Sequence, residues 1–198
     1  MHTRMLISAS WLLVLCSSVS VVCRSVAAEE LRAERPNFVF IMADDLGWAD
    51  VQFHGGTVPT PHLNQLAAGG VELTQHYVAP LCTPTRTGLL SGRFWSRFGV
   101  TKPQNPRALP QQTMTLPRAL KTVGYRTCLV GKWHLGSDPV DGPQKFDFDS
   151  SYGSLAGGGG PWNHRYKQGP FSETWHRDGQ LIEETGHVTD LLCAEIGR

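Results

Sequence analysis

The feature that most restricts the fold of this chain is an alternation of short apolar runs with short amphipathic segments that close at glycine. Residues 38–42 form a continuous apolar run, which is typical of a strand buried on both faces. Residues 60–70 place Leu and Ala on one helical face between a Thr-Pro start and a Gly-Gly stop, and residues 71–78 favour a second strand. Residues 115–124 repeat the helical pattern, and residues 125–136 favour a third strand. We therefore expect an α/β fold with a parallel-rich sheet sandwiched by helices.

The remainder of the chain adds loops, a hairpin and a last helix. Gly and Pro recur over residues 136–143, which indicates an excursion away from the sheet, and residues 157–160 are four consecutive glycines that indicate a flexible loop. Residues 173–184 predict a hairpin that turns at an Asp-Gly pair. Residues 187–198 predict a helix with one apolar face and no strand after it, so we expect a sheet that is incomplete at the C-terminal side.

The amino-terminal segment has the pattern of a secretory signal peptide. Residues 1–28 combine a basic start, a mostly apolar stretch and small residues suited to cleavage, which leaves residues 29–198 as one folded portion. A membrane anchor is the alternative, and the serines that interrupt the apolar stretch favour cleavage. No later segment is long and apolar enough to span a bilayer, so we expect an exported protein, periplasmic or extracellular, with no membrane span after cleavage. The formal net charge of +1 gives no reason to expect a nucleic acid partner.

Three cysteines follow the predicted signal peptide: Cys82, Cys128 and Cys193. Because the number is odd, at least one of them lacks a disulfide partner within the chain or is modified. Cys128 falls within an apolar strand pattern and is predicted to be a buried small residue, while any partner of Cys193 stays open. For Cys82 three interpretations compete: half of a disulfide, a buried apolar residue, or a side chain made for chemistry.

Polar side chains lie at or just after the carboxyl end of each of the three predicted strands. Asp44-Asp45 comes after the first and Cys82 after the second, and Lys132 and His134 lie at the carboxyl end of the third. Open parallel sheets bind ligands beyond the carboxyl ends of their strands, so we expect these groups to converge. Lys132 and His134 are two residues apart on an extended segment, which places them on one side. Each group also has a structural explanation: an Asp pair is often a turn, and a Lys near a His is often a solvated face.

The chemistry of such a convergence can be stated from the residue types. Two adjacent carboxylates are hard ligands that suit Ca²⁺ or Mg²⁺. A helix amino end at Cys82, with Arg86 one turn inside, attracts an oxyanion. Together they indicate a site for an anionic ester with a metal that polarises it. A thiolate prefers softer metals than carboxylate oxygens do, which suggests that Cys82 does not act as cysteine.

Several segments together carry a family resemblance. Residues 82–86 read CTPTR and continue as TGLLSGR, the pattern Cys-x-Pro-x-Arg followed by small residues and Gly-Arg. Four further segments occur in the order that the family has them. They are residues 43–50 (ADDLGWAD) and 60–70 (TPHLNQLAAGG) before this motif, and residues 131–136 (GKWHLG) and the segment HRDGQLIEETGHVTDLL after it. On these segments the chain resembles the sulfatases, specifically the arylsulfatase-like group, from Pro36 to its last residue.

The resemblance implies an alkaline-phosphatase-like fold and a sulfuric ester hydrolase. In this family a maturation enzyme oxidises the motif cysteine, here Cys82, to formylglycine, whose hydrate attacks the sulfur of a sulfate ester. The resemblance places the metal, usually Ca²⁺ with Mg²⁺ possible, on Asp44, Asp45 and the hydrated side chain at position 82. The substrate it implies is a sulfate ester, either an aryl sulfate or a sulfated glycan.

The same resemblance assigns roles to three further side chains. Arg86 would orient the hydrated aldehyde and balance the carboxylates, and Lys132 would bridge the nucleophile and the sulfate. His134 would hydrogen-bond the hydrated aldehyde and help to remove its proton. A phosphate or phosphonate ester hydrolase of the same fold is the first alternative. An exported metal- or glycan-binding fragment without turnover is the second.

The chain also departs from the family pattern. It contains no Asp-Asn pair for the rest of the metal shell, and a later histidine and lysine of the family have no match. The sequence therefore predicts an N-terminal portion of a sulfatase catalytic domain, with little turnover by itself. His164, His176 and His187 do not match the missing histidine in context, and we interpret them as surface or hairpin residues.

Overall fold

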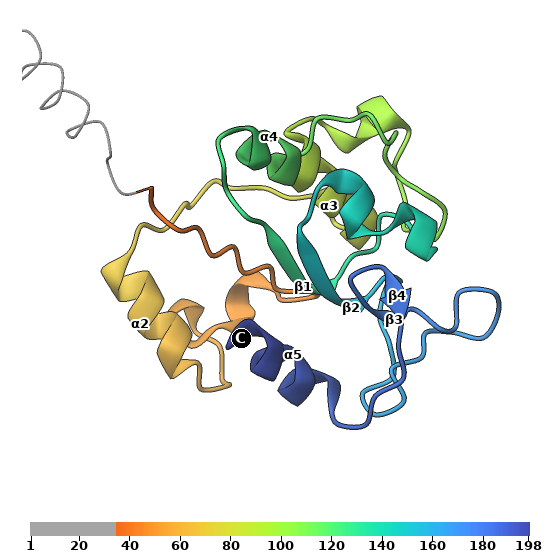
Figure 1. The fold of residues 1–198 in the computed structure, drawn as a ribbon. Coiled ribbons are helices and arrows are strands. Elements are labelled where there is room, and N and C mark those ends of the chain that lie inside the picture. Colours follow the sequence, from red (N-terminus) through yellow and green to blue (C-terminus); the bar gives the residue numbers. More distant parts are fainter. Residues whose placement is uncertain (1–34) are drawn as a thin grey trace, which may run out of the picture. The chain divides into compact units, whose positions relative to one another are not determined.

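The computed structural model describes residues 35–198 (Figure 1), so the predicted signal peptide lies outside the described residues. The chain divides into two compact units, of which the first ends at Leu46 and the second runs from Gly47 to Arg198. Within residues 35–198, no helix has both the length and the apolar character needed to cross a bilayer.

The strand predicted over residues 38–42 is wrong for the described structure. These residues belong to no strand of the sheet, and the large side chains of Phe38, Val39, Phe40 and Ile41 are exposed. The strand predicted over residues 71–78 is also wrong, because this segment is irregular and its apolar residues are exposed. An apolar run shows that a segment gains free energy by burial, but a strand also needs a neighbouring backbone, which the local pattern does not encode.

A mixed four-stranded sheet organises the second unit. Its strands lie in the order β1 (Cys128–Lys132), β2 (Ser150–Ser154), β3 (Trp175–Arg177) and β4 (Gln180–Leu181). β1 and β2 are parallel, whereas β3 is antiparallel to both of its neighbours. The third predicted strand and the hairpin are thus confirmed, and the α/β class with them.

The strand β2 follows residues 136–143, whose glycines and prolines indicated an excursion away from the sheet, and it was not predicted. Its Gly153 has φ +133° and lies opposite Gly131 of β1. A Cβ at Gly153 would be 2.2 Å from the Gly131 carbonyl oxygen, so the two strands meet there at a distance that only glycine allows. A glycine that normally signals a turn is here a point of close backbone approach.

The predicted helices are all present. Two of them begin with a Thr N-cap followed by Pro in the first turn, as expected, but the Thr side chains bond elsewhere. Thr60 Oγ1 accepts from the Gln52 amide at 2.9 Å, and Thr115 Oγ1 donates to the Phe146 carbonyl at 3.1 Å. The helices are α2 (Pro61–Gly69), α3 (Cys82–Ser91), α4 (Leu116–Thr122) and α5 (Val188–Ile196), with 3-10 turns η1 (Trp48–Asp50), η2 (Gln52–His54), η3 (Trp95–Phe98), η4 (Pro139–Asp141) and η5 (Pro143–Phe146).

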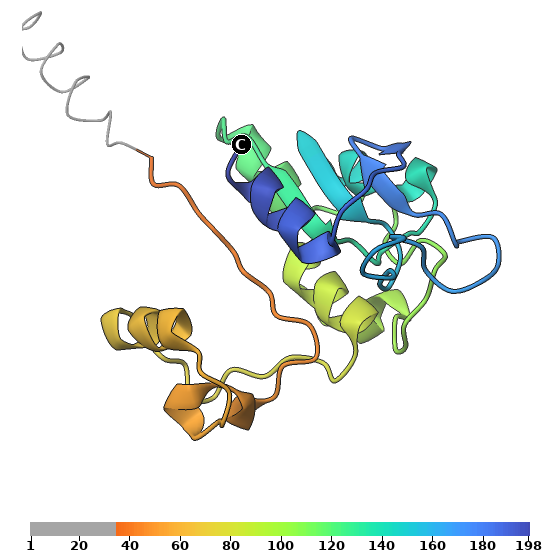
Figure 2. The same cartoon turned by 90° about the horizontal axis from the view of Figure 1, so that it is seen from below.

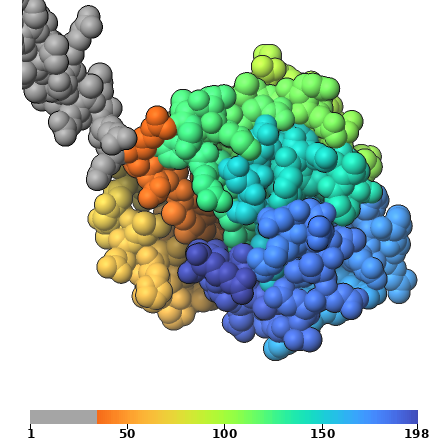
Figure 3. All heavy atoms as spheres, viewed as in Figure 1, coloured from red at the N-terminus to blue at the C-terminus, as the bar shows by residue number. Residues whose placement is uncertain are grey.

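Helices lie on both faces of β1. Leu129 packs against a core cluster that includes Leu90 of α3, whereas Lys132 lines a cavity with residues of α5. Because side chains alternate along a strand, these two contacts are on opposite faces. Figure 2 draws α3 in yellow-green and α5 in dark blue, and Figure 3 shows the outer side of α5 at the surface of the second unit. The core cluster consists of Leu90, Val100, Ala108, Leu109, Trp133, Leu135, Phe146 and Leu155.

Candidate active site

Cys82 is the first residue of α3, as the sequence predicts. Leu81 precedes it in an extended N-cap conformation, and the helix ends at Gly92 in a left-handed conformation. Two contacts hold the first turn of the helix in place: Thr83 is fully buried, and Thr85 Oγ1 donates to the Ala79 carbonyl at 2.8 Å. Cys82 itself is half-buried and has a free thiol. The side chain therefore sits at the positive end of a well-anchored helix.

Arg86 connects this helix to the end of β1. It lies one turn after Cys82 and is half-buried, and its Nη1 donates a hydrogen bond to the Lys132 carbonyl oxygen. This contact joins two segments that are 46 residues apart in the sequence. The Cys-x-Pro-x-Arg segment and the GKWHLG segment, predicted separately to carry chemistry, are thus brought together.

Lys132 is the last residue of β1 and lies opposite Ser154, the last residue of β2. Both line a cavity of about 200 Å³ whose wall includes residues 158–160 of the glycine loop (residues 157–160) and Val188 and Leu192 of α5. Ser154 Oγ donates to the Gly158 carbonyl at 3.1 Å. Ser154 was not identified from the sequence. Its pairing with Lys132 could have revealed it, but only if β2 had been recognised as a strand.

His134 is 3% exposed and lies just beyond β1. The prediction of an extended segment is wrong at this residue, because β1 ends at Lys132 and His134 has a left-handed φ of +56°. Its amide donates to the Leu155 carbonyl at 3.0 Å, which fixes the backbone after the strand ends. Its ring packs against Gly157, so Lys132 and His134 both reach the glycine loop despite the turn between them.

Asp44 and Asp45 lie in the first unit and are exposed, and Asp45 has a left-handed φ of +57°. Their role as metal ligands stays a prediction. Within the described part of the chain, no three His, Cys, Asp or Glu side chains gather as a metal site. Two adjacent carboxylates suit Ca²⁺, but this ion takes six to eight oxygen ligands, so Asp44 and Asp45 are a partial donor set.

His164 and His176 are both buried, so His164 is not a surface residue, whereas His176 lies in the predicted hairpin, on β3. His164 is 4% exposed and stacks on Trp175 at 4.7 Å between ring centroids, with Nε2 2.9 Å from the Gly186 carbonyl oxygen. It also lines the cavity next to Lys132. His176 is fully buried with both ring nitrogens in hydrogen bonds, and burial lowers its pKa. His187 is half-buried at the N-cap of α5, where Nδ1 accepts from the Thr189 amide at 3.3 Å.

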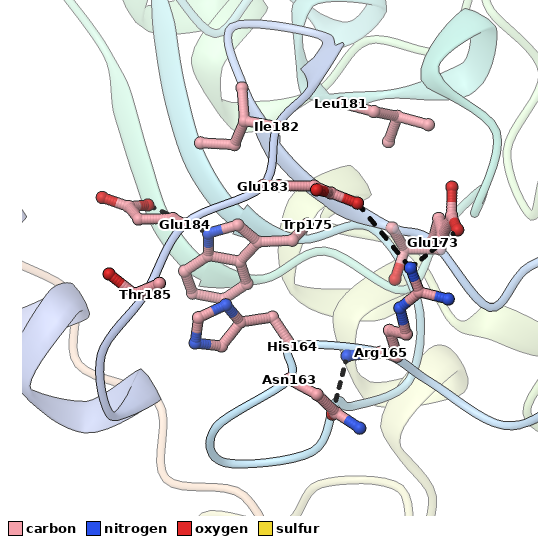
Figure 4. Close-up of a pocket in the computed structure, with 11 residues that line it drawn as sticks. Asn163, His164, Arg165, Glu173, Trp175, Leu181, Ile182, Glu183, Glu184 and Thr185 are labelled. Carbon is pink, nitrogen blue, oxygen red and sulfur yellow. Dashed lines mark hydrogen bonds and ion pairs between the residues drawn. The ribbon is translucent and has the colours of Figure 1, made fainter.

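A larger cavity of about 720 Å³ shares His164 and Trp175 with the cavity next to Lys132 (Figure 4). Arg165 extends between Glu173, at 3.1 Å, and Glu183, at 3.7 Å. One guanidinium thus faces two carboxylates, and none of the residues predicted for catalysis lines this cavity.

Glu184 belongs to the same larger cavity. Its Oε2 accepts from the Tyr152 hydroxyl at 2.6 Å and from Trp175 Nε1 at 3.2 Å. Burial alone would raise the pKa of Glu184, but these donors hold it below its usual value. Burial, followed by the bond to Glu184, raises the pKa of Tyr152 to about 12.

The other two cysteines lie away from these contacts. Cys128 is exposed and free, so its prediction as a buried residue is wrong. It is the first residue of β1, the outer strand of the described sheet, where neither strand nor helix covers its side chain. Cys193 on α5 is likewise exposed and free.

The family model described as Sulfatase matches residues 36–192. The chain belongs to the sulfatase family. It is 44% identical over 135 residues to Arylsulfatase J of Mus musculus, a match that covers 66% of this chain and 23% of that protein. It is 30% identical over 181 residues to Arylsulfatase of Klebsiella aerogenes, covering 85% of this chain and 39% of that protein.

Solved structures agree with the sequence matches. The crystal structure of Ps i-CgsB superposes with a TM-score of 0.73 at 32% identity, and the match covers 82% of this chain and 40% of that chain. A second crystal structure of Ps i-CgsB contains k-i-k-neocarrahexaose. The alkaline-phosphatase-like α/β fold of this N-terminal portion is thus confirmed. The chain spans between about a quarter and two fifths of the length of these relatives.

Proposed function

We propose that this protein is a sulfuric ester hydrolase of the arylsulfatase-like group whose nucleophile forms from Cys82. The observation that carries the proposal is the contact between α3 and the end of β1, where Arg86, one turn after Cys82, donates to the Lys132 carbonyl. This contact joins the segment that carries Cys82 and Arg86 to the segment that carries Lys132. Membership of the sulfatase family supports the same conclusion.

Each of the chain's own side chains has a task in this proposal. Formylglycine at position 82, once hydrated, supplies an oxygen nucleophile and a second hydroxyl that releases the sulfate. Arg86 provides positive charge beneath the nucleophile, and the amino end of α3 adds its partial positive charge. Lys132 binds the sulfate from the end of β1, where its position opposite Ser154 sets the direction of approach. His134 accepts a proton from the hydrated aldehyde.

The metal, the compartment and the substrate belong to the same proposal. Asp44 and Asp45 would supply two carboxylates to Ca²⁺, or to Mg²⁺, which would polarise the sulfate ester. Residues 1–28 would direct export to the periplasm or outside the cell, and residues 29–198 would form the N-terminal portion of the catalytic domain. Relatives named arylsulfatase support an aryl sulfate, and the neocarrahexaose complex of Ps i-CgsB supports a glycan sulfate.

The proposal is tested by the chemical state of Cys82. The chain is produced with a maturation enzyme that is competent on a reference sulfatase, and the peptide that contains Cys82 is analysed by mass spectrometry. We expect the loss of mass that accompanies conversion of the thiol to the aldehyde. Cys128→Ala is the matched control, because that exposed cysteine lies at the far end of β1 from Lys132, and its Cys82 peptide should be converted as in the parent.

Turnover is then measured on matched aryl sulfates and aryl phosphates, and on sulfated and desulfated oligosaccharides. We expect any activity to favour sulfate and to vanish in Cys82→Ala. Because the metal donors within the described residues are a partial set, we expect little turnover from the 198-residue chain alone. If Cys82 kept its thiol while the reference sulfatase was fully converted under the same conditions, the proposed nucleophile would be wrong. If turnover favoured aryl phosphates, the reaction would be phosphate ester hydrolysis instead.

A further inference from the structure

Gly157 leaves no room for a side chain beside the imidazole of His134. A Cβ placed on Gly157 would lie 2.6 Å from His134 Cε1, 2.8 Å from His134 Nε2 and 3.1 Å from the Tyr166 hydroxyl oxygen. Carbon atoms in contact normally stay about 3.5–4.0 Å apart, so any larger residue must displace the ring or the loop. The edge of the ring formed by Cε1 and Nε2 therefore faces the Gly157 backbone directly.

The backbone conformation does not explain this glycine. Gly157 is absent from the residues with a positive φ, so a left-handed conformation is not what requires glycine there. What requires glycine is the space that the His134 ring occupies. The ring cannot simply move away, because His134 is 3% exposed and its backbone is held by the bond from its amide to Leu155.

The rest of the glycine loop differs from Gly157. A Cβ on Gly158 would meet no atom within 4 Å, whereas one on Gly159 would approach the backbone of His164. A Cβ on Gly160 would lie 2.0 Å from the side chain of Asn163, which is part of the turn that closes the loop. Within the run of four glycines, the contact with His134 is thus made at Gly157, and Gly158 offers a neighbour where an added methyl group finds open space.

From this geometry we propose that Gly157 is a positioning residue that sets the orientation of the His134 ring. The inference rests on the proposed function, in which His134 accepts a proton from the nucleophile. The Gly157 backbone packs against the Cε1–Nε2 edge of the ring. This contact fixes the direction of both ring nitrogens before substrate binds. Because a shift of about 1 Å in a reacting group can cost about 100-fold in rate, a methyl group at position 157 would misplace the base.

The test follows the His134 ring itself. The 198-residue chain is labelled with ¹³C and ¹⁵N in histidine, and the His134 Hε1–Cε1 signal is assigned by its loss in His134→Asn. We expect a nuclear Overhauser contact between His134 Hε1 and the Gly157 α-protons. In Gly157→Ala we expect the His134 signal to shift by several linewidths, while Gly158→Ala leaves it in place. An unmoved signal in Gly157→Ala, or an equal shift in Gly158→Ala, overturns the proposal.

A second measurement decides the case in which Gly157→Ala does not fold. Thermal unfolding is compared for the two alanine substitutions in the His134→Asn background, where the ring is absent and Asn tolerates the left-handed φ. In that background we expect Gly157→Ala and Gly158→Ala to have the same melting temperature. If Gly157→Ala lowered the melting temperature as much without the His134 ring as with it, the steric origin would be refuted. Neither measurement needs turnover or a converted Cys82, so a failed sulfatase assay and a failed ring-position test are separate results.

Discussion

Ser151→Ala probes a buried hydrogen-bond network that holds β2 against β3. Ser151 is almost fully buried, and its hydroxyl lies 2.9 Å from His176 Nε2 and accepts from Gln144 Nε2 at 2.7 Å. The other ring nitrogen, His176 Nδ1, is 2.8 Å from the Gly153 carbonyl, to which it can only donate. This assigns the proton to Nδ1 and makes Nε2 the acceptor of the Ser151 hydroxyl.

The cost of the substitution follows from these contacts. Alanine leaves His176 Nε2 without its donor inside the protein, which costs about 1–3 kcal/mol, and removes the bond from Gln144, which contributes about 0.5–1.5 kcal/mol. We therefore expect the free energy of unfolding to fall by about 1.5–4.5 kcal/mol, a large share of the roughly 5–15 kcal/mol that is typical of a domain.

Equilibrium urea unfolding, followed by tryptophan fluorescence at about pH 8, measures this difference while His176 is neutral in both states. Ser150→Ala is the matched control, because its half-buried side chain precedes the network on the same strand, and we expect a change within about 0.5 kcal/mol. If Ser151→Ala were as stable as Ser150→Ala, with an unchanged denaturant slope, the assignment of the network would be refuted.

Three further predictions use the same unfolding measurements. Burial lowers the pKa of His176 below 6.5, so below that pH the unfolded chain binds a proton that the folded chain does not. The free energy of unfolding should therefore fall as the pH drops below about 6.5. If His176→Gln showed the same dependence of unfolding free energy on pH as the parent, this assignment would be wrong. Burial and Glu184 raise the pKa of Tyr152 from 10.0 to about 12, so stability should be lost as the pH rises through this interval, and Tyr152→Phe should flatten that loss in alkaline urea titrations. A Cβ at Gly153 would overlap the Gly131 carbonyl, so Gly153→Ala should cost about 3 kcal/mol or more in thermal unfolding, and a melting temperature like that of Gly158→Ala would disprove the close approach.

The sequence by itself determined the helices and the spacing of the motif on α3. Helical hydrogen bonds join residues four apart, so caps, prolines and glycines within one segment are enough to place α2, α3, α4 and α5. For the same reason the sequence placed Arg86 one turn after Cys82. The sulfatase motifs were readable because they are contiguous segments.

The tertiary structure alone decided which strands pair and which histidines are buried. A strand pairs with residues far away in the chain, so the local pattern predicted strands over residues 38–42 and 71–78 and missed β2. Ser154 and Gly157 entered the site only when β2 lay beside β1 and brought the glycine loop to Lys132 and His134. These contacts join residues that are far apart in the sequence, so the pattern within one short segment does not predict them.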